Sequence, residues 1–404
     1  MTDRPETRFL DRSSPPHIMT LVLLASLPAL TMNIFLPSLP AMARHFDTDY
    51  AIMQLSVSLF LAVNAALQIV IGPVADRFGR RPVLLGAIGL FLLATLGTLV
   101  APTVELFLFF RMCQAVVVAA MVLSRAVVRD MVGEAEAASM IGYVTMGMAL
   151  VPMLGPMLGG ALDELFGWQA SFVVLLLCGV AILWLTWADL GETAPLQSAS
   201  FRAQFAQYPA LLTARRFWGY CAAAAFASGA FFGFLGGAPF VGSEVFGLSP
   251  AVLGIYFAAP AVGYIVGNGL SGRYSTRMGV DRMVLTGTLI TTGGMLTLGA
   301  LVALGLQTAE VFFGFFVFVG LGNGMVVPNA TAGMLSVRPH LAGTASGLGG
   351  AMMIGGGAAM AALAGALLQP GSGPWPLLVI LMATSLASVA SILYVMGRKR
   401  RVGA

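Results

Sequence analysis

Long apolar runs recur along the whole chain, and charged residues, proline or glycine bound each of them. A transmembrane helix needs about 20 mostly apolar residues, whereas a membrane β-strand needs about 10 residues of alternating polarity. The runs are of the first kind, so the pattern predicts transmembrane helices. We expect twelve spans, near residues 18–40, 51–71, 83–101, 104–127, 139–161, 170–188, 217–239, 250–271, 283–304, 309–329, 342–368 and 375–396.

The composition supports a membrane protein and excludes most soluble classes. Of the 404 residues, 58% are hydrophobic and only 9% are charged, whereas a soluble domain has about 25% charged residues. Little chain remains outside the predicted spans, which excludes a soluble catalytic domain, a nucleic-acid-binding domain and a disordered protein. The N-terminal segment lacks a small-residue cleavage site and runs into a full-length span, so we expect no signal peptide.

The distribution of basic residues predicts the orientation. Nineteen of the 21 lie in loops or at span ends on one side of the predicted membrane, and the exceptions are Arg44 on the other side and Arg111 inside a span. By the positive-inside rule, the side with the nineteen is cytoplasmic. An even number of spans then places both termini in the cytoplasm, so we expect a multi-pass membrane protein with both termini on that side.

The chain divides near its midpoint. The longest hydrophilic interval is residues 189–216, with six predicted spans on each side. The two halves contain a short internal repeat at an offset of 200 residues, since Arg77 and Gly79 after span 2 match Arg277 and Gly279 after span 8. We therefore predict an all-α membrane protein with two pseudo-symmetric six-helix bundles. The expected parts are a tail, a bundle, a linker, a bundle and a basic tail, at residues 1–17, 18–188, 189–216, 217–396 and 397–404.

The loop after span 2 reads GPVADRFGRRP at residues 72–82 and resembles motif A of the major facilitator superfamily, whose fold has two parallel six-helix repeats with the site between them. The resemblance implies that the acid contacts the N-terminus of span 11 and that Arg77 pairs with an acid ending span 4, for which Asp130 is the candidate. Such contacts would hold the cytoplasmic side shut. We assign this conformational latch to Gly72, Asp76, Arg77, Gly79, Arg80, Arg81, Arg125, Arg129 and Asp130. The alternative is a solvated basic loop that only follows the positive-inside rule.

Span 4 contains LFLFFRMCQ at residues 106–114, which resembles motif B, whose arginine lies deep in the membrane. A charge at that depth costs a few kcal/mol or more, so Arg111 should face a cavity or bond to backbone carbonyls. We expect Arg111 and Gln114 to contact substrate. The alternative is structural, with Arg111 holding span 1 to span 4 through hydrogen bonds.

Span 5 contains PMLGPMLGG at residues 152–160, which is close to motif C, a motif associated with exporters. Val151 stands where the fuller motif often has glycine, so the match is partial. Small residues also permit close helix packing, which is the alternative explanation. The motif residues are Pro152, Gly155, Pro156, Gly159 and Gly160.

Five short strings occur in order across most of the chain: LPSLP at 36–40, RAVVRD at 125–130, GW at 167–168, PFV at 239–241 and PNA at 328–330. Together they resemble the bicyclomycin/chloramphenicol-resistance (Bcr/CflA) drug exporters of bacterial inner membranes. The resemblance implies export of small xenobiotics in exchange for protons. It also implies a monomer that needs no cofactor and takes its energy from the proton gradient.

Asn33 departs from that family, in which span 1 usually carries an aspartate at this place. Asparagine does not titrate, so it cannot carry a proton. No acid or histidine lies near the centre of a predicted span, which leaves Arg111 as the only midplane charge. We therefore expect an electropositive cavity that disfavours lipophilic cations and accepts neutral, zwitterionic or anionic compounds. Proton coupling would be weakened, or relocated to an edge acid such as Asp76 or Asp130.

Other polar and aromatic residues within the spans are weaker candidates. Gln54 and Tyr256 join Asn33, Arg111 and Gln114 as predicted substrate contacts, although interhelical hydrogen bonding is at least as common a role. Phenylalanines of span 7 could stack on an aromatic drug. The three cysteines lie in apolar segments and are interpreted as small buried hydrophobes, which predicts neither a disulfide nor a metal site.

Three alternative functions remain open. Within transport, the alternative is a dedicated metabolite exporter or an uncoupled facilitator. A membrane-embedded enzyme would need a nucleophile and base, or metal ligands, at one depth, and no His, Asp or Glu lies mid-span. A non-transporting receptor or scaffold would predict a relaxed motif A, whereas motif A is intact.

Overall fold

The structure, a computed structural model, describes residues 9–131, 140, 144, 151, 154–193, 213–338 and 342–402, and all regular structure in these residues is helical. Residues 154–166 form one helix. The others are α1 (Ile18–Asn33), η1 (Leu36–Ser38), α2 (Leu39–His45), α3 (Tyr50–Phe78), α4 (Arg80–Val100), α5 (Val104–Gln114), η2 (Ala115–Val117), α6 (Val118–Met131), α8 (Gln169–Asp189), α11 (Arg215–Phe240), η3 (Val241–Val245), α12 (Pro250–Tyr256), α13 (Ala258–Met278), α14 (Val280–Ala303), α15 (Ala309–Gly314), α16 (Phe316–Val337), α17 (Ala342–Leu367) and α18 (Trp375–Val402).

Eleven helical segments of the described residues are long and apolar enough to cross a membrane. They coincide with eleven predicted spans, and the predicted span 5 falls mainly outside the described residues. Span 1 is broken into α1, η1 and α2 because Pro37 and Pro40 lack the backbone N–H that a continuous helix requires. The prediction of an all-α transmembrane fold is confirmed.

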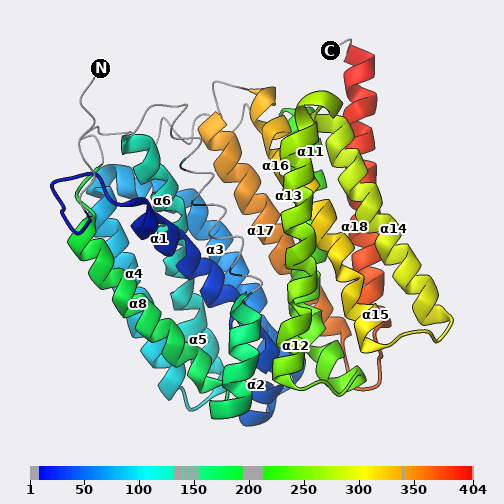
Figure 1. The fold of residues 1–404 in the computed structure, drawn as a ribbon, viewed down its shortest axis with the longest axis horizontal. Helices are drawn as coiled ribbons and strands as arrows, with labels where there is room; N and C mark the ends of the chain where they lie inside the picture. Colours follow the sequence, from blue (N-terminus) through cyan, green and yellow to red (C-terminus); the bar gives the residue numbers. More distant parts are fainter. Residues whose placement is uncertain are drawn as a thin grey trace.

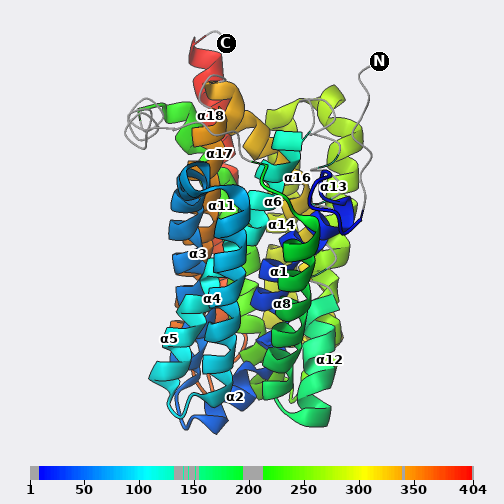
Figure 2. The same ribbon diagram turned by 90° about the vertical axis from the view of Figure 1, so that its left-hand side faces the viewer.

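The long helices run side by side between two faces (Figures 1 and 2). We call one the terminal face, because α1 begins and α18 ends there, and the other the opposite face, which holds α2 and the start of α12 (Figure 1). α1 to α8 form a first group of helices and α11 to α18 form a second group (Figure 1). Between the groups, α3 packs along α17. The exact domain boundaries stay a prediction, because residues 194–212 of the predicted linker lie outside the described residues.

Two carboxylates that follow or end α8 cap neighbouring helices at the terminal face. Asp189 is fully buried, and its oxygens accept hydrogen bonds from the backbone N–H of Leu10 and His17 and from the hydroxyl of Thr20, which fixes the start of α1. Glu192 accepts from the backbone N–H groups of Arg80 (2.8 Å) and Arg81 (3.3 Å), which begin α4. Carboxylates are favoured at these positions because the first turn of a helix has unpaired N–H groups and a partial positive charge. The end of the predicted N-terminal tail is therefore part of the packed structure.

The predicted internal repeat appears as one backbone feature in both groups. Gly79 separates α3 from α4 with φ +93° and ψ 151°, and Gly279 separates α13 from α14 with φ +81° and ψ 155°. Only glycine adopts this conformation without strain, which explains why both positions carry it. The surroundings differ, because a Cβ at Gly79 would overlap the Glu192 carboxylate, whereas a Cβ at Gly279 would meet nothing within 4 Å.

This contrast predicts unequal costs for the same substitution at the two glycines. Gly279→Ala should destabilise the protein by about 1 kcal/mol through backbone strain alone, and Gly79→Ala by about 2 to 3 kcal/mol because it also displaces Glu192. Thermal unfolding of the two variants in the same detergent, followed by tryptophan fluorescence, measures the difference. Equal shifts of the midpoint would show that Glu192 contributes nothing at Gly79.

Candidate functional site

A cavity of about 930 Å³ lies between the two groups of helices and reaches from the middle of the bundle to the terminal face. Its middle part is lined mainly by aromatic and apolar side chains of α11 and α13, with a few polar groups between them. These residues are Ser228, Phe231, Phe232, Leu235, Phe257, Pro260 and Tyr264, with Gln68 and Asn323 from α3 and α16. The size and mixed lining are typical of a pocket for a small organic molecule.

The charges of the cavity lining are balanced and lie towards the terminal face. Among the described lining residues, the charged ones are Asp76, Arg80, Arg125 and Asp130, all from α3, α4 and α6. Arg111 does not line the cavity, so the expectation of an electropositive cavity is wrong for the lining that the structure describes. Of the two environments expected for Arg111, a cavity or backbone carbonyls, the structure shows the second.

At the opposite face the two groups meet closely. The Tyr50 hydroxyl, at the start of α3, donates to the carbonyl of Gly236 in α11 at 2.8 Å. A Cβ at Gly160 would overlap the carbonyl of Pro250, and one at Gly254 would overlap the carbonyl of Pro156. Backbones approach so closely only where side chains are absent. These contacts close the bundle at the opposite face, whereas the cavity reaches the terminal face.

Arg111 is buried inside the first group, with 1% of its surface exposed. Its guanidinium donates to the carbonyls of Thr31 in α1 (2.8 Å) and Ser56 in α3 (3.3 Å) and to the Gln114 side chain (2.7 Å). The guanidinium carbon lies 4.4 Å from the ring centre of Phe35 and 4.2 Å from that of Phe60. These contacts match the structural alternative for motif B, in which the arginine holds span 1 to span 4.

The other four predicted substrate contacts also lie outside the cavity lining. Gln114 donates to Thr95 in addition to accepting from Arg111, and Tyr256 donates to Glu310 and stacks on Phe313. The Asn33 amide donates to the carbonyl of Ala29, and its oxygen is buried without a hydrogen-bond partner in the described part of the chain. A role of these residues in substrate binding remains a prediction.

Gln54 occupies the contact between the groups rather than the cavity. It is fully buried between Gly236 of α11 and Gly365 of α17, where a Cβ on either glycine would collide with it. Neither the nitrogen nor the oxygen of its amide has a hydrogen-bond partner among the described residues. A buried amide without partners costs about 1 to 3 kcal/mol, so Gln54 destabilises the closed contact at the opposite face.

Motif A forms an ionic cluster within the first group, but the predicted partner is wrong. Arg80, not Arg77, pairs with Asp130 (3.2 Å), and Arg80 also pairs with Asp76 (2.6 Å). The break at Gly79 explains the difference, because it turns the chain so that Arg80 begins α4 beside the ends of α3 and α6. Arg77, in the last turn of α3, is exposed with its guanidinium over Phe78.

The remaining latch residues have separate roles. Arg81 donates to the carbonyls of Leu190 and Trp187 and so fixes the end of α8. A Cβ at Gly72 would meet nothing within 4 Å, so no described neighbour requires a glycine there in this conformation. The side chain of Arg129 and the predicted contact of the motif A acid with the N-terminus of span 11 lie outside the described residues.

The glycines of motif C pack against span 1 and against the second group. Gly155 faces Asn33, and a Cβ at Gly159 would overlap the carbonyl of Ile34, where α1 ends. Gly160 and Pro156 contact α12 and its start, as described above. Pro152 lies outside the described residues. Gly160 and Pro156 of the motif therefore lie at the contact between the groups, and Gly155 and Gly159 pack inside the first group.

Sequence reasoning missed most of the cavity lining. Met121, Met334 and Ile354 line it, yet no sequence signal separates them from apolar residues that face lipid. Two signals were available: the phenylalanines of span 7, of which Phe231 and Phe232 line the cavity, and the glycine-rich stretch of span 11, of which Gly347 and Gly350 line it.

Comparisons with known proteins agree on one family. The model of the Major Facilitator Superfamily matches residues 21–362 and 238–403. An uncharacterized MFS-type transporter, YdgK of Bacillus subtilis, is 30% identical over 81% of this chain and 82% of its own length. A chloramphenicol resistance protein of Pseudomonas aeruginosa is 29% identical over 92% of this chain and 89% of its own. Multidrug resistance protein D of Escherichia coli is 29% identical over 90% of this chain and 92% of its own length.

Solved structures show the same fold. A bacterial homologue of the human lysosomal transporter Spinster, in an inward-facing and unoccupied conformation, superposes with a TM-score of 0.68, covers 94% of each chain and is 17% identical. The human organic anion transporter MFSD10 gives a TM-score of 0.68 at 17% identity and covers 94% of this chain and 98% of its own. At these identities the likeness concerns the fold alone.

The two groups of apolar helices, with a cavity between them, define a multi-pass membrane transport protein. The chain belongs to the Major Facilitator Superfamily. The resemblance to drug-resistance exporters is also confirmed, because relatives with such names match most of the chain. Members of this superfamily are transporters rather than enzymes.

The contacts of Arg111 predict a structural phenotype. Arg111→Ala leaves buried acceptors on Thr31, Ser56 and Gln114 unpaired and should destabilise the protein by about 3 kcal/mol or more. Arg111→Lys should recover less than half of the loss, because an ammonium cannot bridge three acceptors between two rings. The control Arg77→Ala, at an exposed arginine, should stay within about 0.5 kcal/mol of the wild type.

Thermal unfolding of the purified variants in detergent measures these effects. If Arg111→Ala unfolded at the same temperature as Arg77→Ala while substrate binding was lost, Arg111 would be a substrate contact after all.

Proposed function

We propose that this protein exports small, mostly uncharged organic compounds of antibiotic-like size from the bacterial cytoplasm across the inner membrane. The observation that carries the proposal is the cavity itself, which has an aromatic and apolar middle part and balanced charges near the terminal face. An apolar pocket with no unbalanced charge favours neutral molecules, because a permanent ion would lose its hydration without gaining a counter-charge. Zwitterionic and anionic compounds are weaker candidates.

The direction of export follows from the orientation that we propose. Nineteen basic residues at one side predict that the terminal face is cytoplasmic. The cavity reaches that face, so it is placed to take up compounds from the cytoplasm or the inner leaflet. Relatives named for chloramphenicol and multidrug resistance support the same class of cargo.

Release outside requires the contact at the opposite face to open. In our proposal the two groups rock about the cavity, the terminal face closes and the Tyr50–Gly236 hydrogen bond breaks. Opening would hydrate the Gln54 amide, which recovers free energy that the closed contact lacks. The closed contact is therefore weak enough for exchange between two states of similar free energy.

Aromatic contacts in the cavity should determine affinity. Phe231→Ala removes a ring from the lining and should raise KM for a phenicol-like neutral compound about fivefold, the loss of one aromatic contact. Phe226→Ala is a matched control, because Phe226 lies on the same helix with 37% of its surface exposed and does not line the cavity. Uptake into inside-out vesicles with radiolabelled chloramphenicol measures both variants.

A panel of cargo compounds tests the charge preference with the same vesicles. We expect transport of neutral phenicols and little transport of ethidium. Preferential transport of ethidium or other lipophilic cations would overturn the proposed substrate class.

We also propose that proton antiport drives export, through acids of the cavity mouth rather than span 1. Asn33 cannot carry a proton, whereas Asp76 and Asp130 both line the cavity beside Arg80. Protonation of either acid would break its ion pair with Arg80, so proton binding and the conformation of the mouth would be linked.

Energised inside-out vesicles test this coupling with a pH-sensitive dye. Wild-type vesicles with an acidified interior should alkalinise when a transported compound is added. The double variant Asp76→Asn, Asp130→Asn should transport the compound downhill without alkalinisation. If the wild type transports without any pH change, the protein is an uncoupled facilitator and this coupling proposal is wrong.

A further inference from the structure

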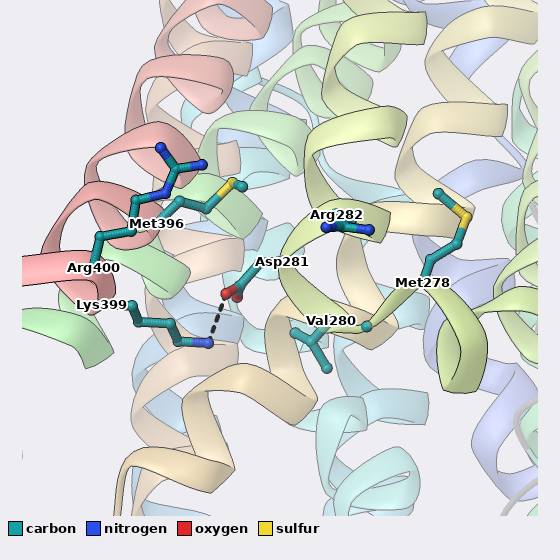
Figure 3. A pocket seen from close by; sticks show the side chains of 8 residues that line it. Met278, Val280, Asp281, Arg282, Met396, Lys399 and Arg400 are labelled. Atoms are coloured by element: carbon teal, nitrogen blue, oxygen red, sulfur yellow. Dashed lines mark hydrogen bonds and ion pairs between the residues drawn. The ribbon is translucent and has the colours of Figure 1, made fainter. Parts of the chain in front are cut away.

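The second group contains another pocket, of about 560 Å³, at the terminal face where α13 turns into α14 and α18 ends (Figure 3). Asp281 from α14 and Lys399 from α18 point toward each other across it and form an ion pair of 2.7 Å (Figure 3). The Tyr220 hydroxyl of α11 donates to the other oxygen of Asp281 at 2.5 Å. Asp281 is therefore neutralised by protein groups.

Two further cations line the pocket. Arg282 and Arg400 are exposed. The four charged lining residues thus leave a net charge of two positive units. The remaining lining side chains are apolar and come from the same helix ends, namely Met278, Val280 and Met396. The pocket is therefore cationic with an apolar wall.

The internal repeat allows the start of α14 to be compared with the start of α4. In the first group, the backbone N–H groups that begin α4 after Gly79 donate to the Glu192 carboxylate, which fills the space beside that glycine. In the second group, the backbone N–H groups of Val280 and Asp281, which begin α14 after Gly279, have no acceptor in the described part of the chain. The space beside Gly279 holds no atom within 4 Å of a Cβ position.

The charged residues that the neighbouring helix supplies also have opposite signs in the two groups. Where the first group supplies an acid after α8, the second group continues α18 as a helix and presents Lys399 and Arg400. In the first group, the Glu192 carboxylate thus accepts from the backbone N–H groups at the helix start. In the second group, the acid of the first turn, Asp281, is paired with Lys399 instead, and the other charged lining residues are cations. Such a position is suited to an external anion with oxygen acceptors.

We propose that this pocket binds the phosphate of an anionic phospholipid, with its glycerol and acyl chains along Met278, Val280 and Met396. A lipid is favoured over free phosphate because the pocket combines cations with an apolar wall at the end of transmembrane helices, where lipid headgroups lie. Basic pockets between transmembrane helices are suited to anionic headgroups. The site lies in the second group alone and does not depend on the proposed cargo or on coupling.

Native mass spectrometry of the purified full-length protein tests the site. Dioleoyl phosphatidylglycerol is titrated against dioleoyl phosphatidylcholine in a neutral detergent, with three forms of the protein. The double variant Arg282→Gln, Arg400→Gln removes the two exposed cations of the pocket. The control Arg273→Gln, Arg398→Gln removes two positive charges from the same face of the same group outside the pocket lining.

We expect the wild type to bind one phosphatidylglycerol with preference over phosphatidylcholine, and the pocket variant to bind it about 20-fold more weakly. The control should retain the affinity of the wild type. Equal weakening in both double variants would show general surface attraction and would overturn the proposal, as would equal binding of the two lipids by the wild type.

A competition experiment separates the two sources of phosphate. Inorganic phosphate at ten times the lipid concentration should leave the bound phosphatidylglycerol in place, because it lacks contacts with the apolar wall. Displacement of the lipid at that concentration would identify a free-phosphate site and overturn the assignment to a phospholipid.

Discussion

The inability of a bilayer to solvate backbone amides and charges is the constraint from which this structure follows. Each apolar segment of the described residues satisfies its backbone within a helix, and carboxylates and arginines gather where helices end. At the terminal face Asp189 and Glu192 cap α1 and α4, and Arg80 joins the ends of α3, α4 and α6. Beside Gly279 the one acid of the first turn, Asp281, is paired with Lys399, and Arg282 and Arg400 add positive charge around an open pocket.

Arg111 shows how one charge can lie inside such a structure. Three acceptors and two aromatic faces replace its hydration, so the residue stabilises the first group instead of serving the cavity. The cavity middle is thereby left without an unbalanced charge. Stability and cargo selection are divided between different residues: the arginine organises α1, α3 and α5, while the aromatic side chains of α11 and α13 face the cavity.

The two faces of the bundle differ in how firmly they are held. The ionic cluster of Asp76, Arg80 and Asp130 lies within one group, so it leaves the terminal mouth of the cavity open. The opposite face is closed by backbone contacts at glycines and by one hydrogen bond from Tyr50, and it buries the unpaired amide of Gln54. A contact that is close but incompletely satisfied suits the proposed alternation between two states.

Apolar runs of membrane length allow few alternatives, so the sequence was enough to predict the transmembrane helices of the described residues and the family. It also located the repeat, since Gly79 and Gly279 share one backbone conformation. It did not predict where the helices end, because α3 and α16 continue past the predicted spans to Phe78 and Val337. The partner of Asp130, the direction of the Arg111 side chain and the residues that line the cavity became clear only from the packed helices. Spacing along a helix fixes a side chain's direction only relative to its own axis. Which neighbour it meets depends on how the helices rotate against each other, and that rotation is set by packing across the whole bundle.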